Sequence, residues 1–204
     1  TIGFHPEEKG HNETLKSVFI EELKRITRLS IKPYFSTSNN DLIEKIKNKE
    51  VDFAFLSGFA YAIASEKDEI IPLVRAIYNE TDAYRGAIVV LKESKINSIK
   101  DLKGKRIAFV EKGSTSGYLL PQVTLLKSGI DPSKYFSKIL FAGKHDLSVN
   151  MLINGEVDAA VCWIDEIDDK RGAWTQYLDK EKAKLIIPIF VTSKVPHNSF
   201  CVRN

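Results

Sequence analysis

Strand-like and helix-like apolar patterns alternate along the chain, and this alternation is the feature that most limits its fold. In the first part, strand patterns lie at residues 1–4, 30–35, 51–56 and 70–78, and helical patterns at 12–26, 39–47 and 57–64. Strands that are joined through helices favour an α/β fold in which helices cover a largely parallel sheet.

The alternation then starts again. Strand patterns follow at residues 87–91, 106–110, 139–141, 157–161 and 185–191, with helical patterns after a turn at 113–117 and at 146–153. Two α/β units of roughly 80 to 100 residues predict two lobes rather than one sheet. The composition, with 43% apolar and 10% aromatic residues in 204, is that of a globular protein.

Charge argues against a nucleic-acid partner. Thirty Lys and Arg against 27 Asp and Glu leave a net charge of +3, spread along the chain instead of gathered in a basic tract. A small anionic ligand is compatible with this balance. The longest apolar runs, such as 159–164, fall far short of the roughly 18 residues of a membrane span, and no signal segment opens the chain. We therefore expect a cytosolic protein or one whose leader is missing here.

Cysteine and histidine positions predict no metal site and no cofactor. Cys162 and Cys201 lack the C-x-x-C spacing of zinc ribbons and redox motifs, and the four histidines are scattered without an H-E-x-x-H pair.

The segment Glu111-Lys-Gly-Ser-Thr-Ser-Gly-Tyr118 follows a predicted strand and opens a predicted helix. Backbone N–H groups of such a turn point into one concavity, and the helix dipole adds partial positive charge there. The hydroxyls of Ser114, Thr115 and Ser116 add further donors. The segment therefore predicts an oxyanion cradle, although a serine-rich helix N-cap has the same residue types. The glycine spacings of a P-loop and of a Rossmann turn are absent, which argues against a nucleotide site.

The segment Gly143-Lys-His-Asp146 lies between the next predicted strand and the next predicted helix. Ligands of open α/β sheets bind at the carboxyl ends of strands. We therefore expect His145 to reach the same edge of the sheet as residues 111–118, here called the serine-rich turn. There it could donate to an anion. A surface or capping histidine is the plainer interpretation, and Asp146 is a credible N-cap.

Several stretches, taken in order, resemble the phosphonate- and phosphite-binding type of periplasmic solute-binding protein. They are Val51-Asp-Phe-Ala-Phe-Leu-Ser-Gly58, Tyr84-Arg-Gly-Ala-Ile-Val-Val90, Ile99-Lys-Asp-Leu-Lys-Gly-Lys-Arg-Ile-Ala-Phe109, Gly113-Ser-Thr-Ser-Gly-Tyr118 with Pro121, Gly143-Lys-His-Asp146 and Asn154-Gly-Glu-Val-Asp-Ala-Ala160. The resemblance covers nearly the whole chain, and it rests on the combination because no single stretch is specific.

This resemblance implies a two-lobed clamshell of the type II periplasmic-binding-protein kind, with mixed sheets flanked by helices. Lobe 1 would be residues 1–84, completed by about 193–204 crossing back, and lobe 2 would be 85–192. The protein would capture a phosphonate, phosphite or phosphate-like oxyanion between its lobes without changing it. An ABC transporter permease or a signalling partner would receive it. The implied location is the periplasm or the extracellular face of the membrane, with contact to the membrane only through a leader, anchor or fused segment outside this chain.

The resemblance also implies ligand-binding residues. The anion donors would be Ser114, Thr115, Ser116 and His145. Tyr84 would be a tyrosine of the ligand cleft, and Asp165 an acid that holds a ligand's amine. In the first lobe the candidates are Leu56, which stands where another cleft tyrosine is usual, and Ser57. Lys144 replaces the usual serine before His145, and it could pair with Asp165 so that no ligand amine is required.

Three alternatives stay open. The chain could be the ligand-sensing domain of a larger receptor such as a sensory histidine kinase. A metalloid sensor of the same fold would use Cys162, since thiolates favour soft ligands, although a buried small apolar residue is the plainer role. A hydrolase would use Gly113-x-Thr115-x-Gly117 as a nucleophile turn, with Asp165 and His197 following in hydrolase order. Threonine is rare at that turn, so we expect no enzymatic activity.

Overall fold

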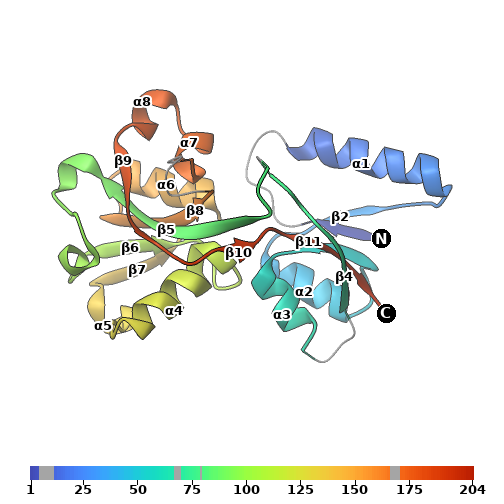
Figure 1. Cartoon of the computed structure of the whole chain (residues 1–204), viewed down its shortest axis with the longest axis horizontal. Helices are drawn as coiled ribbons and strands as arrows, with labels where there is room; N and C mark the ends of the chain where they lie inside the picture. Colours follow the sequence, from blue (N-terminus) through green and yellow to red (C-terminus); the bar gives the residue numbers. More distant parts are fainter. Residues whose placement is uncertain (5–11, 67–69, 79, 166–170) are drawn as a thin grey trace. The chain divides into compact units, whose positions relative to one another are not determined.

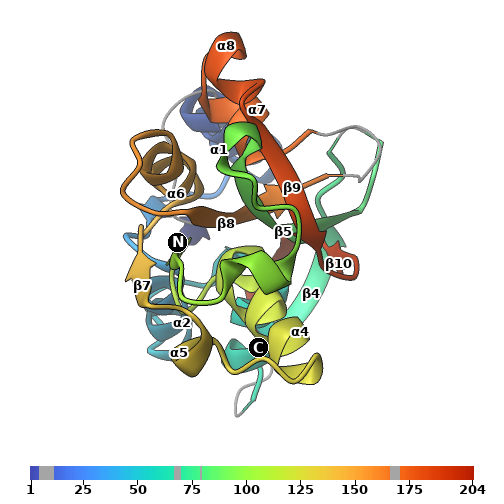
Figure 2. The same cartoon turned by 90° about the vertical axis from the view of Figure 1, so that its left-hand side faces the viewer.

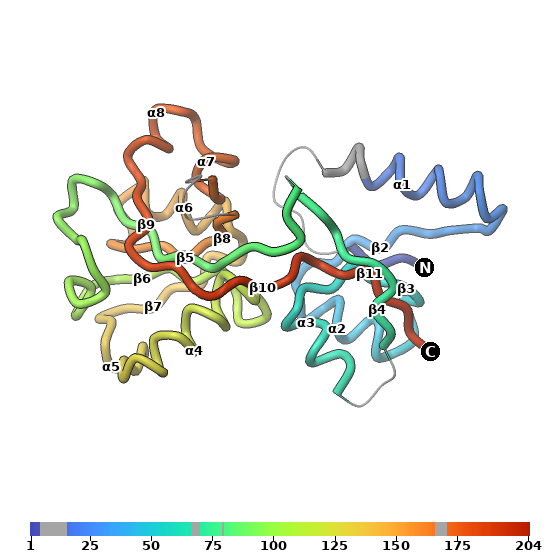
Figure 3. The backbone as a smooth tube through the Cα atoms, viewed as in Figure 1, coloured from blue at the N-terminus to red at the C-terminus, as the bar shows by residue number. Residues whose placement is uncertain are grey.

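The computed structural model describes residues 1–4, 12–66, 70–78, 80–165 and 171–204. It divides into two compact units, one of Thr1–Tyr78 with His197–Asn204 and one of Asn79–Pro196. Figure 3 traces the backbone of each unit. The sequence placed the lobe boundaries near residues 84 and 193, whereas the compact units divide after Tyr78 and after Pro196.

Unit 1 contains a five-stranded mixed sheet of order β2-β1-β3-β11-β4 (Figure 1). Its strands are β1 (Ile2–Phe4), β2 (Pro33–Phe35), β3 (Phe53–Leu56), β4 (Ile70–Arg75) and β11 (Ser199–Arg203). β1 pairs in parallel with β2 and β3, whereas β11 pairs antiparallel with β3 and β4. The unit therefore needs both ends of the described chain to complete its sheet.

Helices cover both faces of this sheet, with α1 (Asn12–Thr27) on one side and α2 (Asn39–Lys47) and α3 (Gly58–Ala64) on the other (Figure 1). On the α1 side, Ile20 packs with Ile2 and Phe4. On the other side a Cβ at Gly3 would lie 2.5 Å from Leu42 of α2, so only glycine allows this close approach.

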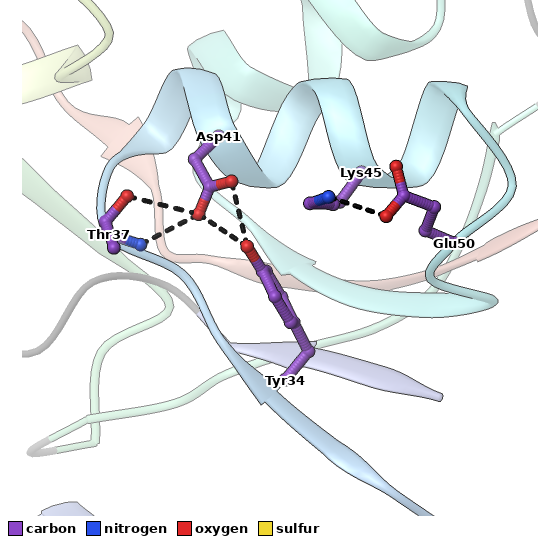
Figure 4. A network of polar contacts seen from close by, with 5 residues as sticks. All are labelled: Tyr34, Thr37, Asp41, Lys45 and Glu50. Atoms are coloured by element: carbon purple, nitrogen blue, oxygen red, sulfur yellow. Dashed lines mark hydrogen bonds and ion pairs between the residues drawn. The ribbon is translucent and has the colours of Figure 1, made fainter.

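The start of α2 is held by a polar network (Figure 4). Asp41 accepts hydrogen bonds from the Tyr34 hydroxyl at 2.8 Å and from the Thr37 N–H at 2.9 Å. Burial acts to raise the pKa of the Asp41 carboxyl, but the bonds from Thr37 and Tyr34 outweigh it and hold the pKa below its usual value. An ion pair between Lys45 and Glu50 ties the other end of the helix to the following loop. The network fastens β2 to α2 and has a structural role.

Unit 2 contains a mixed sheet of order β10-β5-β8-β6-β7, with β9 paired to β5. Its strands are β5 (Ala83–Leu91), β6 (Arg106–Phe109), β7 (Lys138–Phe141), β8 (Ala159–Ile164), β9 (Ile186–Val191) and β10 (Val195–Pro196). β6 pairs in parallel with β7 and β8, whereas β5 runs antiparallel to β8, β9 and β10. The expectation of a largely parallel sheet is wrong here, because the chain enters unit 2 along β5 and leaves it along β9 and β10.

Side chains of β5 alternate between two cores, as the period of a strand requires. Ala87 and Val89 pack on the side of α6 and α7, and Ile88 and Val90 on the side of α4 and α5 (Figure 2). The helices of unit 2 are a π-helix (Thr115–Leu119), α4 (Leu120–Lys127), α5 (Pro132–Tyr135), α6 (His145–Ile153), α7 (Ala173–Tyr177) and α8 (Lys180–Ala183), with 3-10 turns at Lys92–Ser94 and Ile99–Leu102.

The predicted fold class is confirmed: the chain is an α/β protein with two mixed sheets flanked by helices. Among the described helices, none combines the length and the apolar character needed to cross a membrane.

Candidate functional site

The topology of unit 2 brings its predicted ligand residues to one edge of the sheet. Because β6, β7 and β8 are parallel neighbours, their carboxyl ends meet at the same edge. β5 runs the other way, and Arg85 near its start lies opposite Ile164 at the end of β8. In strand order, the candidates along this edge are Tyr84 on β5, Asp165 after β8, Ser114, Thr115 and Ser116 after β6, and His145 after β7.

The serine-rich turn is built as a π-helix. The N–H of Leu119 donates to the Ser114 carbonyl at 3.0 Å, and the N–H of Leu120 donates to the Thr115 carbonyl, which gives two successive i to i+5 bonds. Isolated π turns of this kind are frequent at functional sites. Glycine is required within the turn, because a Cβ at Gly117 would lie 2.4 Å from the Val110 side chain.

Ser114 is the N-cap of this helix, and its Oγ accepts a hydrogen bond from the N–H of Gly117 at 3.0 Å. The cap interpretation is therefore confirmed for Ser114. It does not compete with anion binding, since a hydroxyl that accepts can still donate its own hydrogen. All three hydroxyl residues are buried, Ser116 to 2% exposure. Within the described part of the chain, the N–H of Ser116 has no hydrogen-bond acceptor. The turn thus keeps donors that a bound oxyanion could accept.

His145 opens α6 beside the end of β6. The N–H of Ala142 donates to the Phe109 carbonyl at 2.8 Å, and the N–H of Gly143 donates to the Val110 carbonyl at 2.7 Å. Gly143 has a φ of +84°, a left-handed conformation that suits glycine. These bonds bring the segment before His145 alongside the start of the serine-rich segment, as predicted from the strand ends.

Burial lowers the pKa of His145 to about 4, although the nearby carboxylates of Asp146 and Glu111 act to raise it. The residue as a whole is half-buried, whereas its Nδ1 is shielded from solvent. A neutral imidazole at pH 7 carries one N–H donor, which is enough to bind an anion oxygen. The prediction that Asp146 caps the helix is wrong. The N-cap is Lys144, whose φ of −141° and ψ of 159° are extended, and Asp146 lies inside the first turn, where its charge suits the helix dipole.

Tyr84 on β5 and Asp165 directly after β8 lie one residue beyond the paired Arg85 and Ile164. Asp165 is 5% exposed, and its N–H donates to the Arg171 carbonyl at 2.9 Å. Tyr84 is half-buried and lies opposite Val195 of β10.

The remaining candidates belong to unit 1. Leu56 ends β3 and is 1% exposed in the apolar cluster under α2 and α3. Ser57 is the N-cap of α3, where its Oγ accepts from the N–H of Ala60 at 3.3 Å and donates to Asn39 Oδ1 at 3.5 Å. Leu56 thus contributes to the core of unit 1, and Ser57 to a helix start.

Sequence reasoning missed a buried serine that fastens α6, the helix that begins at His145, to the sheet. Ser148 lies on α6 one turn after His145 and has 0% exposure. Its hydroxyl donates to the Val161 carbonyl of β8 at 2.9 Å. The available signal was a serine at position i+3 from the histidine, followed directly by Val149 within the helix.

The metalloid-sensor and hydrolase hypotheses find little support in the described residues. No group of three or more His, Cys, Asp or Glu among them could hold a metal ion. Cys162 is fully buried in the apolar cluster of unit 2, which agrees with a packing role. Thr115 opens a π-helix, and His197 packs edge-on against Tyr78 within unit 1 at 4.9 Å between ring centroids.

Comparison with known proteins identifies the family. The family model described as "ABC transporter, phosphonate, periplasmic substrate-binding protein" matches residues 2–204. The chain is 34% identical over 137 residues to the Phosphate-import protein PhnD of Mycolicibacterium smegmatis, covering 62% of this chain and 43% of that protein.

Two solved structures share the fold. The binding protein component of an ABC phosphonate transporter from Pseudomonas aeruginosa superposes with a TM-score of 0.81 at 23% identity, over 100% of this chain and 68% of that one. PhnD1 from Prochlorococcus marinus in complex with methylphosphonate superposes with a TM-score of 0.79 at 21% identity, over 99% and 75% of the two chains.

The chain spans about half the length of the curated relatives that it matches, 43% of one and 50% of another. The family match, however, extends over almost all of its residues. The chain therefore belongs to the family of periplasmic substrate-binding proteins of phosphonate ABC transporters and has their type II fold.

Proposed function

We propose that this protein is the solute-binding component of an ABC importer and that it captures a small phosphorus oxyanion outside the cytoplasm. The observation that carries the proposal is the edge of the unit 2 sheet, where a buried π-helical turn and the first residue of α6 bring neutral hydrogen-bond donors together. Family membership supports the transport role over that of a receptor domain.

The anion half of the site would be formed by the turn and His145. The hydroxyls of Ser114, Thr115 and Ser116 and the N–H of Ser116 would donate to the ligand's oxygens. The partial positive charge at the start of the helix would offset the ligand's negative charge. His145, neutral at pH 7, would add an N–H donor from the neighbouring strand end. Hydrogen bonds to a charged ligand contribute about 1.5 to 3 kcal/mol each, so loss of one donor should weaken binding by about one to two decades.

We infer that the ligand leaves unchanged. The turn and His145 offer hydrogen-bond donors, and binding an anion through them requires no covalent bond to form or break. This is what a transport protein needs, because the captured solute must reach the permease intact.

The ligand class we favour is phosphate, phosphite or a short alkyl phosphonate. Asp165 beside a bound anion would repel it unless the ligand carried a proton or an amine. Tyr84 would line the same edge from β5. One relative is named for phosphate import, and one solved structure holds methylphosphonate.

We further propose that the two compact units, Thr1–Tyr78 with His197–Asn204 and Asn79–Pro196, act as the lobes and that ligand closes them. The permease of an ABC transporter would recognise the closed form in the periplasm.

A thermal-shift panel tests the proposal. The panel contains phosphate, phosphite, methylphosphonate, 2-aminoethylphosphonate and sulfate, and a ligand at 100 times its Kd adds about 2.7 kcal/mol to stability. Calorimetry on Thr115→Ala and Ser116→Ala should then find affinity reduced by about one to two decades for the ligand that binds. Ser128→Ala is the matched control, since it removes a hydroxyl at the far end of α4 that donates to the Thr124 carbonyl. No shift with any anion, or unchanged affinity in both turn variants, would refute the proposal.

A further inference from the structure

Gly86 on β5 packs directly against the serine-rich turn. A Cβ built on Gly86 would lie 2.6 Å from the Ser116 carbonyl oxygen and 3.1 Å from Pro121 Cγ. Real Cβ atoms essentially never come this close to another atom without a bond to it, so a side chain here would require the backbone of the turn to shift. The contact joins residues 30 positions apart in sequence, and the local sequence around Gly86 does not predict it.

Thr192, directly after β9, holds Gly86 in place. Its Oγ1 accepts from the N–H of Gly86 at 2.9 Å and donates to the Ser193 carbonyl at 2.9 Å. Its own N–H donates to the Gly86 carbonyl at 2.9 Å, and its carbonyl accepts from Arg85 Nη1 at 2.8 Å. Thr192 is 2% exposed, and the bond between its Oγ1 and the N–H of Gly86 is buried.

We propose that Thr192 and Gly86 are positioning residues for the serine-rich turn. The hydrogen bonds of Thr192 fix the position of the β5 backbone at Gly86, and the close contact with Gly86 fixes the position of the Ser116 backbone. The proposal rests on the proposed function, because it concerns the same turn. Neither residue needs to touch the ligand.

The physical argument is one of rigidity. The Ser116 carbonyl and N–H belong to adjoining peptide groups of one turn, so a displacement of the carbonyl also reorients the donors beside it. Loss of the Thr192 hydroxyl would leave the N–H of Gly86 buried without an acceptor, and β5 would shift to recover one. Affinity for an oxyanion depends on several donors converging within a few tenths of an ångström, so this shift would weaken binding.

A purely structural role would lower stability and leave affinity unchanged at temperatures where the protein is folded. The test therefore compares three variants of the full chain: Thr192→Val, which keeps the shape and removes the hydroxyl; Thr192→Ser, which keeps the hydroxyl; and Gly86→Ala. Thr124→Val is the matched control, because the Thr124 hydroxyl donates only to the Leu120 carbonyl within α4.

Two measurements are made on each protein. Amide NMR of residues 114–119 without ligand reports the position of the turn, and calorimetry with phosphate, phosphite and methylphosphonate reports affinity. We expect Thr192→Val and Gly86→Ala to shift the amide signals of Ser116 and Gly117 and to weaken binding by about tenfold or more, which corresponds to about 1.4 kcal/mol. Thr192→Ser should restore affinity to within about twofold, and Thr124→Val should leave both readouts unchanged.

Wild-type affinity in folded Thr192→Val, or unmoved signals from the turn, would overturn the proposal. If the wild-type protein binds none of the three anions while Thr192→Val still moves the turn, the positioning contact is supported and the proposed function fails. The two ideas are therefore separable in one set of experiments.

Discussion

His145 should make the stability of unit 2 depend on pH between 7 and 5. Its pKa is about 4 in the folded protein against 6.5 for an ordinary histidine. The unfolded chain therefore binds more protons than the folded one in this range, and the free energy of unfolding falls as the pH falls. At pH 7 the unfolded histidine is mostly neutral and the effect is small. At pH 5 the unfolded state holds nearly one extra proton, and the loss is about 2 kcal/mol.

Tryptophan fluorescence during urea unfolding measures this loss, because the chain's two tryptophans, Trp163 and Trp174, both lie in unit 2. Carboxyls with lowered pKa values, such as that of Asp158, stay ionised in both states above pH 5 and lose their contribution only at lower pH. His145→Gln should remove most of the difference between pH 7 and pH 5, whereas His197→Gln in unit 1 should keep it. An equal pH dependence in wild type and His145→Gln would refute the burial argument.

Three further expectations follow from particular contacts. Ser148→Ala should lower the free energy of unfolding by about 1 to 3 kcal/mol, since it leaves the buried Val161 carbonyl without this donor; urea unfolding that matches wild type would contradict this. Asp158→Asn should cost only about 1 kcal/mol, because its ion pair with Arg106 is partly exposed, and a loss above about 3 kcal/mol would show that the pair behaves as a buried one. If the ligand lacks an amine, Asp165→Asn should not weaken binding of phosphite or methylphosphonate in competition calorimetry. A preference of the wild type for 2-aminoethylphosphonate that Asp165→Asn abolishes would make Asp165 an amine anchor instead.

Local pattern predicted most elements, and it erred at their ends for an identifiable reason. The strand expected at 157–161 runs as Ala159–Ile164, because pairing with β5 continues to Ile164. The strand expected at 70–78 ends at Arg75, where its pairing with Ser199 ends. A strand stops where its partner stops, and the partner lies far away in the sequence.

The residues of the turn are a different case. Ser114 as a cap, Gly117 and the position of the turn after β6 follow from residue types and spacing, since capping and turn chemistry act over a few residues. The same holds for His145 at a neighbouring strand end, because parallel neighbours share an edge once their order is known.

Pairing order itself came only from the folded chain. β5 lies between β8 on one side and β9 and β10 on the other, and this arrangement makes the unit 2 sheet mixed and brings Tyr84 near Asp165. In unit 1, the antiparallel pairing of β11 with β3 and β4 also makes the sheet mixed. Gly86 contacts Ser116, which lies 30 residues further along the chain, and it is hydrogen-bonded to Thr192, which lies 106 residues further along. Such contacts join segments that are far apart in the sequence, so local periodicity and residue chemistry do not predict them. They are determined by close packing in the assembled sheet, where only a residue without a Cβ fits between the two backbones.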